Sequence, residues 1–376
     1  MVRACRTAVH LAAIETATLL RRNGREKEYH PRQVVSREIL TLLLFFLAVI
    51  PTLVFPQYKL PETTGEYPVA SVLYTYTDKN RIEEYAKKVE NRKVTVEFWY
   101  PVNAEGIYPL VLFSHGALGI QSSNLSLYRE LASHGYVVVS IAHPYQSFWT
   151  SGEDGQITFL NLDYLKEIQQ EDAKTDKLQS YAYYQKWMNI RTGDINFVID
   201  TVVKNAKGSS GGVYSLVDTE KIGVMGHSLG GSAALCLGRQ RSDVNAVIAL
   251  ESPLLCDIEG VEKGEFVITD QIYPVPVLNV YSDATWNHLS EWTQYGANYA
   301  LLSGTQTTAF NVHINGAGHF SLTNLPLSSP SLAWVLEGEK PTRNSEECLK
   351  IIDKVVLKFY DAYMKSQGEF SNYGDY

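Results

Sequence analysis

Short apolar runs alternate with amphipathic stretches along most of the chain, which predicts strands and helices in turn. The runs are six to nine residues long and lie at 93–100, 109–115, 136–143, 221–226, 246–251, 275–283 and 309–314. Several are apolar at every position, as are strands that are buried on both faces of a parallel sheet. Helical patterns occupy 125–134, 182–205, 229–240 and 345–366, the last with Ser345 as the expected N-cap.

This alternation predicts one α/β domain over residues 59–376, with a mostly parallel sheet that has helices on both faces. The stretch "YKLPETTGEYPVAS", punctuated by Pro and Gly, predicts an extended linker before it. The connection 144–184 is too long for a simple crossover and is rich in aromatic residues. We expect either a lid or pocket wall, or a surface excursion with its own small cluster.

The N-terminal part has a different pattern. Residues 1–38 carry eight Lys and Arg against four Glu, and an uncharged apolar run, "ILTLLLFFLAVIPTLVF", follows. At 1.5 Å per residue this run reaches about 25 Å, slightly less than a hydrocarbon core. An uncleaved signal anchor over 39–58 is the preferred interpretation; a cleaved signal peptide and a buried core helix are the alternatives. The positive-inside rule then places 1–38 in the cytoplasm and the catalytic domain outside it, or secreted if the signal is cleaved.

The charge of the chain argues against a nucleic-acid partner, and its cysteine content leaves disulfide pairing open. The 376 residues carry a net charge of −8, and outside the N-terminus no basic cluster suggests a nucleic-acid groove. Of the four cysteines, Cys236 is most simply a small buried hydrophobe. Cys256 and Cys348 are the two that look free to form a disulfide, and the sequence does not decide whether they pair.

The stretch "KIGVMGHSLGGSAALCLGR" contains the clearest chemical motif. Gly226-His227-Ser228-Leu229-Gly230 fits G-x-S-x-G between a predicted strand and a predicted helix. Glycines at the flanking positions allow close packing at such a corner, while the serine is lifted into a strained, accessible position. Ser228 is therefore the candidate nucleophile, and it needs a base to take its proton.

Three histidines follow Ser228, and they are the candidates for that base. His313 lies within a strand-like run, and His288 lies in a loop or on a helix surface. Local packing or hydrogen bonding is therefore the simpler role for both residues. His319, in "NGAGHFSL", follows the last predicted strand in a glycine-flanked loop. An imidazole there can lie over the strand ends toward Ser228, so His319 is the predicted base.

The acid that orients the base is either Glu251 or Asp283. Each ends a predicted strand, where ligands of open α/β sheets bind. For the oxyanion, the backbone N–H of Leu229 supplies one donor, and Ala117 in "FSHGALG" is the expected second donor. His115 in the same turn is expected to be a structural hydrogen-bonding group.

Together, "LVLFSHGALG", "LASHGYVVVSIAH", "KIGVMGHSLGG", "VIALESP" and "GAGHF" resemble the platelet-activating-factor acetylhydrolase family of α/β-hydrolases. They resemble dienelactone hydrolases and cutinase-like enzymes more distantly. The likeness spans about Thr64 to Lys365. It implies the α/β-hydrolase fold, no metal, no bound cofactor, and esters with short or oxidised acyl chains, including lipid-like ones. In α/β-hydrolases in general, the later of the two candidate strands supplies the acid, which would be Asp283 here. The pattern of the acetylhydrolase family instead implies Glu251, although the family has Asp at that position.

These features predict a membrane-anchored serine carboxylic-ester hydrolase that forms an acyl-enzyme on small-molecule or lipid-like esters. Aromatic residues of 144–184, with Trp286 or Trp292, are expected to line its pocket. A peptidase or lactone hydrolase would use the same catalytic residues, and a non-catalytic binding protein of this fold is a further alternative. Acyl length, leaving group and oligomeric state stay open.

Overall fold

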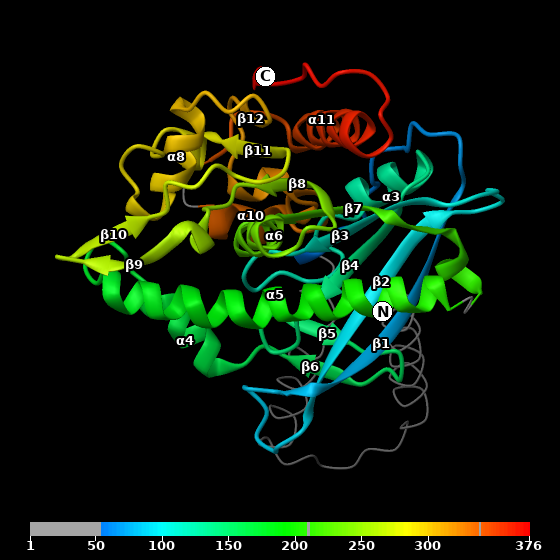
Figure 1. Cartoon of the computed structure of the whole chain (residues 1–376), viewed down its shortest axis with the longest axis horizontal. Coiled ribbons are helices and arrows are strands. Elements are labelled where there is room, and N and C mark those ends of the chain that lie inside the picture. Colours follow the sequence, from blue (N-terminus) through cyan, green and yellow to red (C-terminus); the bar gives the residue numbers. More distant parts are fainter. Residues whose placement is uncertain (1–53, 209–210, 338–339) are drawn as a thin grey trace, which may run out of the picture.

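The computed structural model describes residues 54–208, 211–337 and 340–376. In these ranges one sheet contains nine strands in the order β1-β2-β4-β3-β7-β8-β11-β12-β13 (Figure 1). Their bounds are β1 (Val69–Ile82), β2 (Asn91–Pro101), β3 (Tyr108–Ser114), β4 (Val137–Ala142), β7 (Val217–His227), β8 (Val244–Leu250), β11 (Val277–Ser282), β12 (Ala309–Ile314) and β13 (Gly374–Asp375). From β4 to β13 neighbouring strands are parallel, and β2 is antiparallel to β1 and to β4. The predicted α/β class with a mostly parallel sheet is confirmed.

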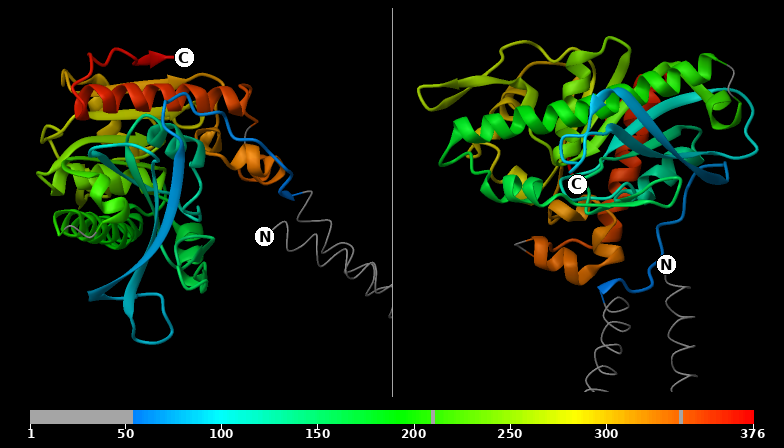
Figure 2. Two further views of the ribbon diagram at one scale, coloured as in Figure 1. Left: turned by 90° about the vertical axis from the view of Figure 1, so that its right-hand side faces the viewer. Right: turned by 90° about the horizontal axis from the view of Figure 1, so that it is seen from below.

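Four helices cover the two faces of the sheet. Figures 1 and 2 show α5 (Lys177–Lys207) and α6 (Leu229–Gln240) on one face, with α3 (Leu125–Ser133) and α11 (Ser345–Met364) on the other. The remaining helices and strands are short: α4 (Leu162–Gln170), α7 (Asp283–Trp286), α8 (Gly296–Ser303), α9 (Leu325–Ser328), α10 (Pro330–Glu337), η1 (Gly212–Leu216), η2 (Leu255–Asp257), η3 (Thr293–Tyr295), η4 (His319–Leu322), β5 (Trp149–Ser151), β6 (Ile157–Phe159), β9 (Ile258–Glu262) and β10 (Glu265–Ile268).

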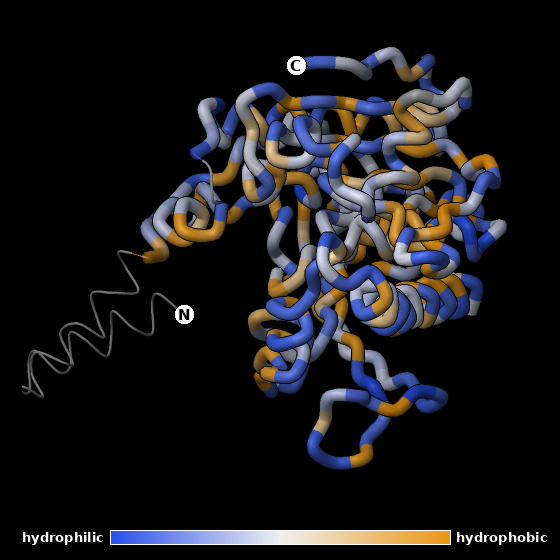
Figure 3. The backbone as a smooth tube through the Cα atoms, turned by 90° about the vertical axis from the view of Figure 1, so that its left-hand side faces the viewer, coloured by the Kyte–Doolittle hydropathy of each residue, from blue (hydrophilic) through white to orange (hydrophobic). Residues whose placement is uncertain are grey.

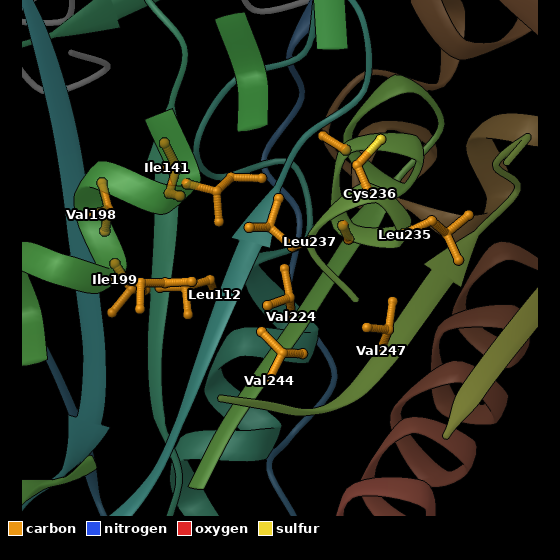
Figure 4. Packing of buried hydrophobic residues seen from close by; sticks show 14 of the residues in the cluster. Leu112, Ile141, Val198, Ile199, Val224, Leu235, Cys236, Leu237, Val244 and Val247 are labelled. Carbon is orange, nitrogen blue, oxygen red and sulfur yellow. The ribbon is translucent and has the colours of Figure 1, made fainter. Parts of the chain in front are cut away.

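The core has two layers, one for each face of the sheet. Figure 4 shows the layer in which aliphatic side chains of α5 and α6 pack on β3, β4, β7 and β8. The second layer joins α3 and α11 to the opposite face. The continuously apolar strands are buried on both faces as predicted: every residue of β4 is buried. Hydrophobic segments accordingly run through the middle of the molecule in Figure 3.

Two expectations at the ends of elements need correction. The N-cap of α11 is Asn344, whose side chain accepts hydrogen bonds from the amides of Glu346 and Glu347, so Ser345 is the first helical residue. The stretch expected to be a linker already enters β1 at Val69. Its earlier residues are bound to the end of α3, where the Thr64 amide donates to a carboxylate oxygen of Glu130 at 2.8 Å.

The interpretation of Cys236 as an unpaired buried hydrophobe is also wrong. Cys236 in α6 forms a disulfide with Cys256 in η2, with 5.5 Å between their Cα atoms. Cys348 is buried and free, because α11 lies on the opposite face of the sheet from α6. The sequence showed neither that η2 folds back onto α6 nor that the sheet separates Cys348 from both partners.

Within the described ranges, no helix is both long enough and apolar enough to cross a membrane. The expected cytoplasmic segment 1–38 and most of the expected anchor 39–58 lie outside the described residues.

Candidate active site

Ser228 lies at the sharp corner between β7 and α6. Its backbone φ of 52° and ψ of −126° define a conformation that residues other than glycine rarely adopt. The corner is held by its amide, which donates to the Leu250 carbonyl of the neighbouring strand at 2.8 Å. A Cβ atom at Gly226 or Gly230 would collide with backbone atoms of this corner and of β3. The two motif glycines are therefore required by packing, and the strained serine is partly exposed.

His319 begins η4, directly after the β12 strand and its following turn. The Nε2 atom of His227, the residue before Ser228, donates to the His319 carbonyl at 3.0 Å. The two imidazole rings lie 4.6 Å apart between centroids. The structure thus brings His319 to the nucleophile corner. Burial lowers the pKa of His319 to about 4, so its ring is neutral at pH 7 and able to accept a proton.

The loop that carries His319 is fixed by a carboxylate at the end of α10. Both carboxylate oxygens of Glu337 accept from the Phe320 amide, at 3.1 and 3.3 Å. Burial raises the pKa of this Glu337 carboxyl above its ordinary value. Sequence reasoning missed Glu337, since the carboxylate is 18 residues from His319 in the chain and no motif connects the two.

Glu251 follows β8 and lies next to the same corner. It comes directly after Leu250, whose carbonyl accepts the Ser228 amide, and its own φ is 56°. The carboxylate is fully buried and accepts from the amide and the hydroxyl of Ser282, at 2.5 and 2.8 Å. Burial raises the pKa of Glu251 to about 7, despite these hydrogen bonds.

Asp283, the other candidate acid, bonds to a different histidine. Its carboxylate accepts from the Nε2 atom of His313 at 2.8 Å and from the Gly316 amide at 2.9 Å. His313 also meets Asp375 at 3.0 Å through its Nδ1 atom. Among the described residues, neither candidate carboxylate is hydrogen-bonded to the ring of His319. Glu251 differs from Asp283 in that it lies beside the Ser228 backbone.

The two expected oxyanion donors belong to the helix that follows Ser228 and to a turn that packs against Ser228. Leu229 is the first residue of α6, where an amide has no partner within the helix. A Cβ atom at Gly116 would lie 3.2 Å from the Cβ atom of Ser228, so the turn after β3 packs directly against the nucleophile. In the described part of the chain the Ala117 amide donates no hydrogen bond, whereas the amides of the next two residues, Leu118 and Gly119, are bonded.

Behind this turn lies a buried polar network that sequence reasoning missed. The Oγ atom of Ser114 and the Nε2 atom of His143 are 2.8 Å apart, and the Nδ1 atom of His143 is 2.8 Å from Asp194. This arrangement has the residue types of a catalytic triad, but all three side chains are buried in the core. No substrate can reach Ser114, so the group is structural. Arg191 belongs to the same region. Its residues come from β3, the β4 end and α5, and no spacing in the sequence connects them.

The aromatic residues expected around the pocket divide into three sets. Tyr164 and Tyr184 of the 144–184 connection are buried and pack with Trp187. In contrast, Phe148 and Phe159 of the β5–β6 hairpin are 62% and 68% exposed. The other expected aromatic residues pack against histidines: Trp286 stacks on His313 and Trp292 on His288. His288 also bonds to Glu291.

Two further features bear on cofactors and ligands. No cluster of three His, Cys, Asp or Glu side chains suited to a metal ion occurs in the described ranges. A cavity of about 660 Å³ is lined by residues such as Tyr108, Asp218 and Lys365. Tyr108 and Asp218 lie at the starts of β3 and β7, so this cavity is at the opposite end of the sheet from Ser228.

Comparisons with known proteins agree with this architecture. Residues 69–375 match the family model described as platelet-activating factor acetylhydrolase, isoform II. Cutinase est2 of Thermobifida alba is 26% identical over 239 residues, which are 63% of this chain and 61% of the cutinase. The platelet-activating factor acetylhydrolase of Canis lupus familiaris is 26% identical over 167 residues, 41% of this chain and 37% of that protein. Each match therefore spans less than two thirds of the relative's length.

Among solved structures, a ferulic acid esterase from Streptomyces cinnamoneus superimposes with a TM-score of 0.61 and 19% identity. The superposition covers 82% of this chain and 94% of the esterase chain. This likeness concerns the fold.

Proposed function

The chain belongs to the platelet-activating factor acetylhydrolase, isoform II, family, and on this basis we propose that it is a serine carboxylic-ester hydrolase. The observation that carries the proposal is the strained, partly exposed Ser228 at a strand–helix corner, with the neutral His319 beside it. The strained backbone of a serine in this conformation costs conformational free energy, and a turn with only a structural role could avoid this cost by having glycine there. The related cutinase and acetylhydrolase support the same reaction class.

In the proposed mechanism His319 takes the proton of Ser228 as the hydroxyl attacks the ester carbonyl. The amides of Leu229 and Ala117 stabilise the oxyanion. His319 then gives its proton to the leaving alcohol, and water repeats the sequence on the acyl-enzyme. No cofactor takes part.

We assign Glu251 rather than Asp283 as the acid of this proposed triad. Glu251 is buried beside the Ser228 backbone, and Asp283 is already bonded to His313. The described geometry has no bond from Glu251 to the His319 ring, so the proposal requires the carboxylate to turn toward the ring as the imidazolium forms. The longer glutamate side chain has the torsional freedom for this movement.

The proposed substrates are short-chain or lipid-like esters, and the proposed location of the enzyme is at a membrane. The basic segment 1–38 and the expected signal anchor 39–58 would hold the catalytic domain on the extracytoplasmic side. The Cys236–Cys256 disulfide supports an oxidising compartment, where such bonds persist.

The first experiment is hydrolysis of p-nitrophenyl esters from acetate to palmitate by the full chain, with Ser228→Ala as the control and fluorophosphonate labelling in parallel. We expect turnover of the shorter esters and labelling by the wild type, and neither by Ser228→Ala. A wild-type protein that is silent on every ester and unlabelled would contradict the proposal and favour a binding protein of this fold. Labelling without ester turnover would instead direct the search to lactones and peptides.

A further inference from the structure

Arg191 lies in the middle of α5, and its side chain is fully buried beneath the turn that carries Ala117. Its guanidinium donates to the His115 carbonyl and, at 3.4 Å, to the Gly116 carbonyl. The Nε atom donates to the side-chain oxygen of Gln146 at 3.0 Å. One side chain thus holds two successive carbonyls of the oxyanion turn.

This cation has no carboxylate partner among the described residues. The nearest acid on its own helix, Asp194, is bonded to Arg92, Arg81 and His143. A buried charge that is hydrogen-bonded only to neutral oxygens is expensive to desolvate. The hydrogen bonds that Arg191 donates to the turn must offset this cost.

Arg191 is one of three donors that together fix the orientation of one peptide group. The Gly116 carbonyl accepts from Arg191, from the Nδ1 atom of His115 at 2.7 Å and from the Gly119 amide at 3.1 Å. Because a trans peptide is planar, its N–H points opposite to its C=O. The N–H of Ala117, in the same peptide group, must then point away from Arg191. Gly116 itself packs against Ser228, since a Cβ atom added to it would lie 3.2 Å from the Cβ atom of Ser228.

We propose that Arg191 is a positioning residue for the oxyanion hole: by binding the carbonyls of His115 and Gly116, it aims the Ala117 amide at the oxygen that becomes negative. The positive charge behind these peptides also polarises them, which strengthens the N–H as a donor to an oxyanion. Arg191 touches no substrate and acts through the backbone. This role rests on the proposed ester hydrolysis.

The test compares Arg191→Met and Arg191→Lys with the wild type in the full chain. Methionine fills most of the volume without donors, and lysine keeps the charge but cannot hold two carbonyls in one plane. Arg239→Met is the control for loss of an arginine elsewhere, because Arg239 also binds two carbonyls, those of Gln271 and Ile272, but at the far end of α6. Since Arg239 is in addition paired with the Asp257 carboxylate, this control is compared in kcat, KM and Ki, and a lower Tm is expected for it. The readouts are kcat and KM on the best p-nitrophenyl ester, and Tm.

A second readout separates positioning from packing. A trifluoromethyl ketone with the same acyl chain adds to Ser228 and places an oxyanion in the hole, whereas the matching methyl ketone only binds. We expect Arg191→Met to lower kcat about 10- to 100-fold with little change in KM, less than the 10²–10³ typical for outright loss of a donor. In Arg191→Met the Ki of the trifluoromethyl ketone should rise by a similar factor, and the Ki of the methyl ketone should not change. Arg191→Lys should show a smaller rise in the Ki of the trifluoromethyl ketone, and Arg239→Met should show none.

The outcomes are decisive in both directions. Folded Arg191 variants with wild-type kcat and wild-type trifluoromethyl ketone Ki would overturn the proposal. Failure of both variants to fold would also overturn the proposal, since it would show that Arg191 is required for the stability of the core. If the wild type itself hydrolyses no ester, the proposed function fails instead, and the two failures are thereby distinguished.

Discussion

At the scale of single residues, burial shifts the pKa values of the proposed base and the proposed acid in opposite directions. It lowers the pKa of His319 to about 4 and raises the pKa of Glu251 to about 7. Both shifts disfavour the charged form, so the resting site carries little charge. Paired groups whose pKa values are displaced by their environment are typical of acid–base sites.

The raised pKa of Glu251 predicts a stability cost that depends on pH. Below pH 4.5 both folded and unfolded chains hold the proton, so there is no cost. Between pH 4.5 and about 7 the unfolded chain loses its proton first, and stability falls as pH rises. Above pH 7 the full cost of a pKa raised from 4.5 to about 7 is on the order of 3 kcal/mol. Glu251→Gln should therefore have a higher Tm than the wild type at pH 8 and nearly the same Tm at pH 4.5. An equal difference at both values would contradict the assigned cause.

The same substitution should separate the two candidate acids in activity. If Glu251 stabilises the imidazolium of His319, Glu251→Gln lowers kcat by at least about 100-fold. Asp283→Asn changes kcat by less than about threefold, because its bonds to His313 and Gly316 lie outside the proposed triad. Steady-state kinetics on one ester decide between them. A larger loss in Asp283→Asn would transfer the role to Asp283 and remove Glu251 from the mechanism.

At the scale of elements, hydrophobic pattern was sufficient for the parallel core. Seven apolar runs became β2, β3, β4, β7, β8, β11 and β12, because strands buried on both faces need apolar residues at every position. The longest strand, β1, was not predicted. It is an edge strand in which Tyr and Thr alternate and most side chains are only partly buried, so its hydrophobic pattern is a weaker signal.

The candidate site was predictable only where the chain is locally constrained. The glycine pattern indicates the Ser228 corner, since the corner is formed by consecutive residues. The contacts of Arg191 could not be predicted, because they join α5 to the turn after β3 across 75 positions. The same holds for Cys236 and Cys256, whose pairing depends on how η2 folds back onto α6.

That disulfide gives a prediction at the element scale. It closes a loop with a sequence separation of 20 residues, for which chain entropy gives a stabilisation of about 3 kcal/mol. The double variant Cys236→Ala/Cys256→Ala should therefore unfold several degrees below the wild type in a thermal melt. Reductant should lower the wild-type Tm toward that of the variant and leave the variant unchanged. Cys348→Ala is the control, in which the response to reductant stays intact; a reductant-insensitive wild type would contradict the bond.

At the scale of the whole molecule, charge is divided unevenly along the chain. Residues 1–38 carry a net charge of +4, and the rest of the chain therefore carries −12. The positive-inside rule and the disulfide lead independently to the same proposed topology, with the catalytic domain on the oxidising side of a membrane.

This topology predicts where Ser228 can be labelled. In intact cells that express the full chain, a fluorophosphonate that does not cross membranes should label the wild type as fully as it does after lysis, and Ser228→Ala should stay unlabelled in both cases. The protein should also sediment with membranes and resist extraction by alkaline carbonate, because an apolar segment of 17 residues holds it. Release into the medium would instead indicate a cleaved signal. Labelling only after lysis would place Ser228 in the cytoplasm, and the disulfide would then have formed against the reducing poise of that compartment.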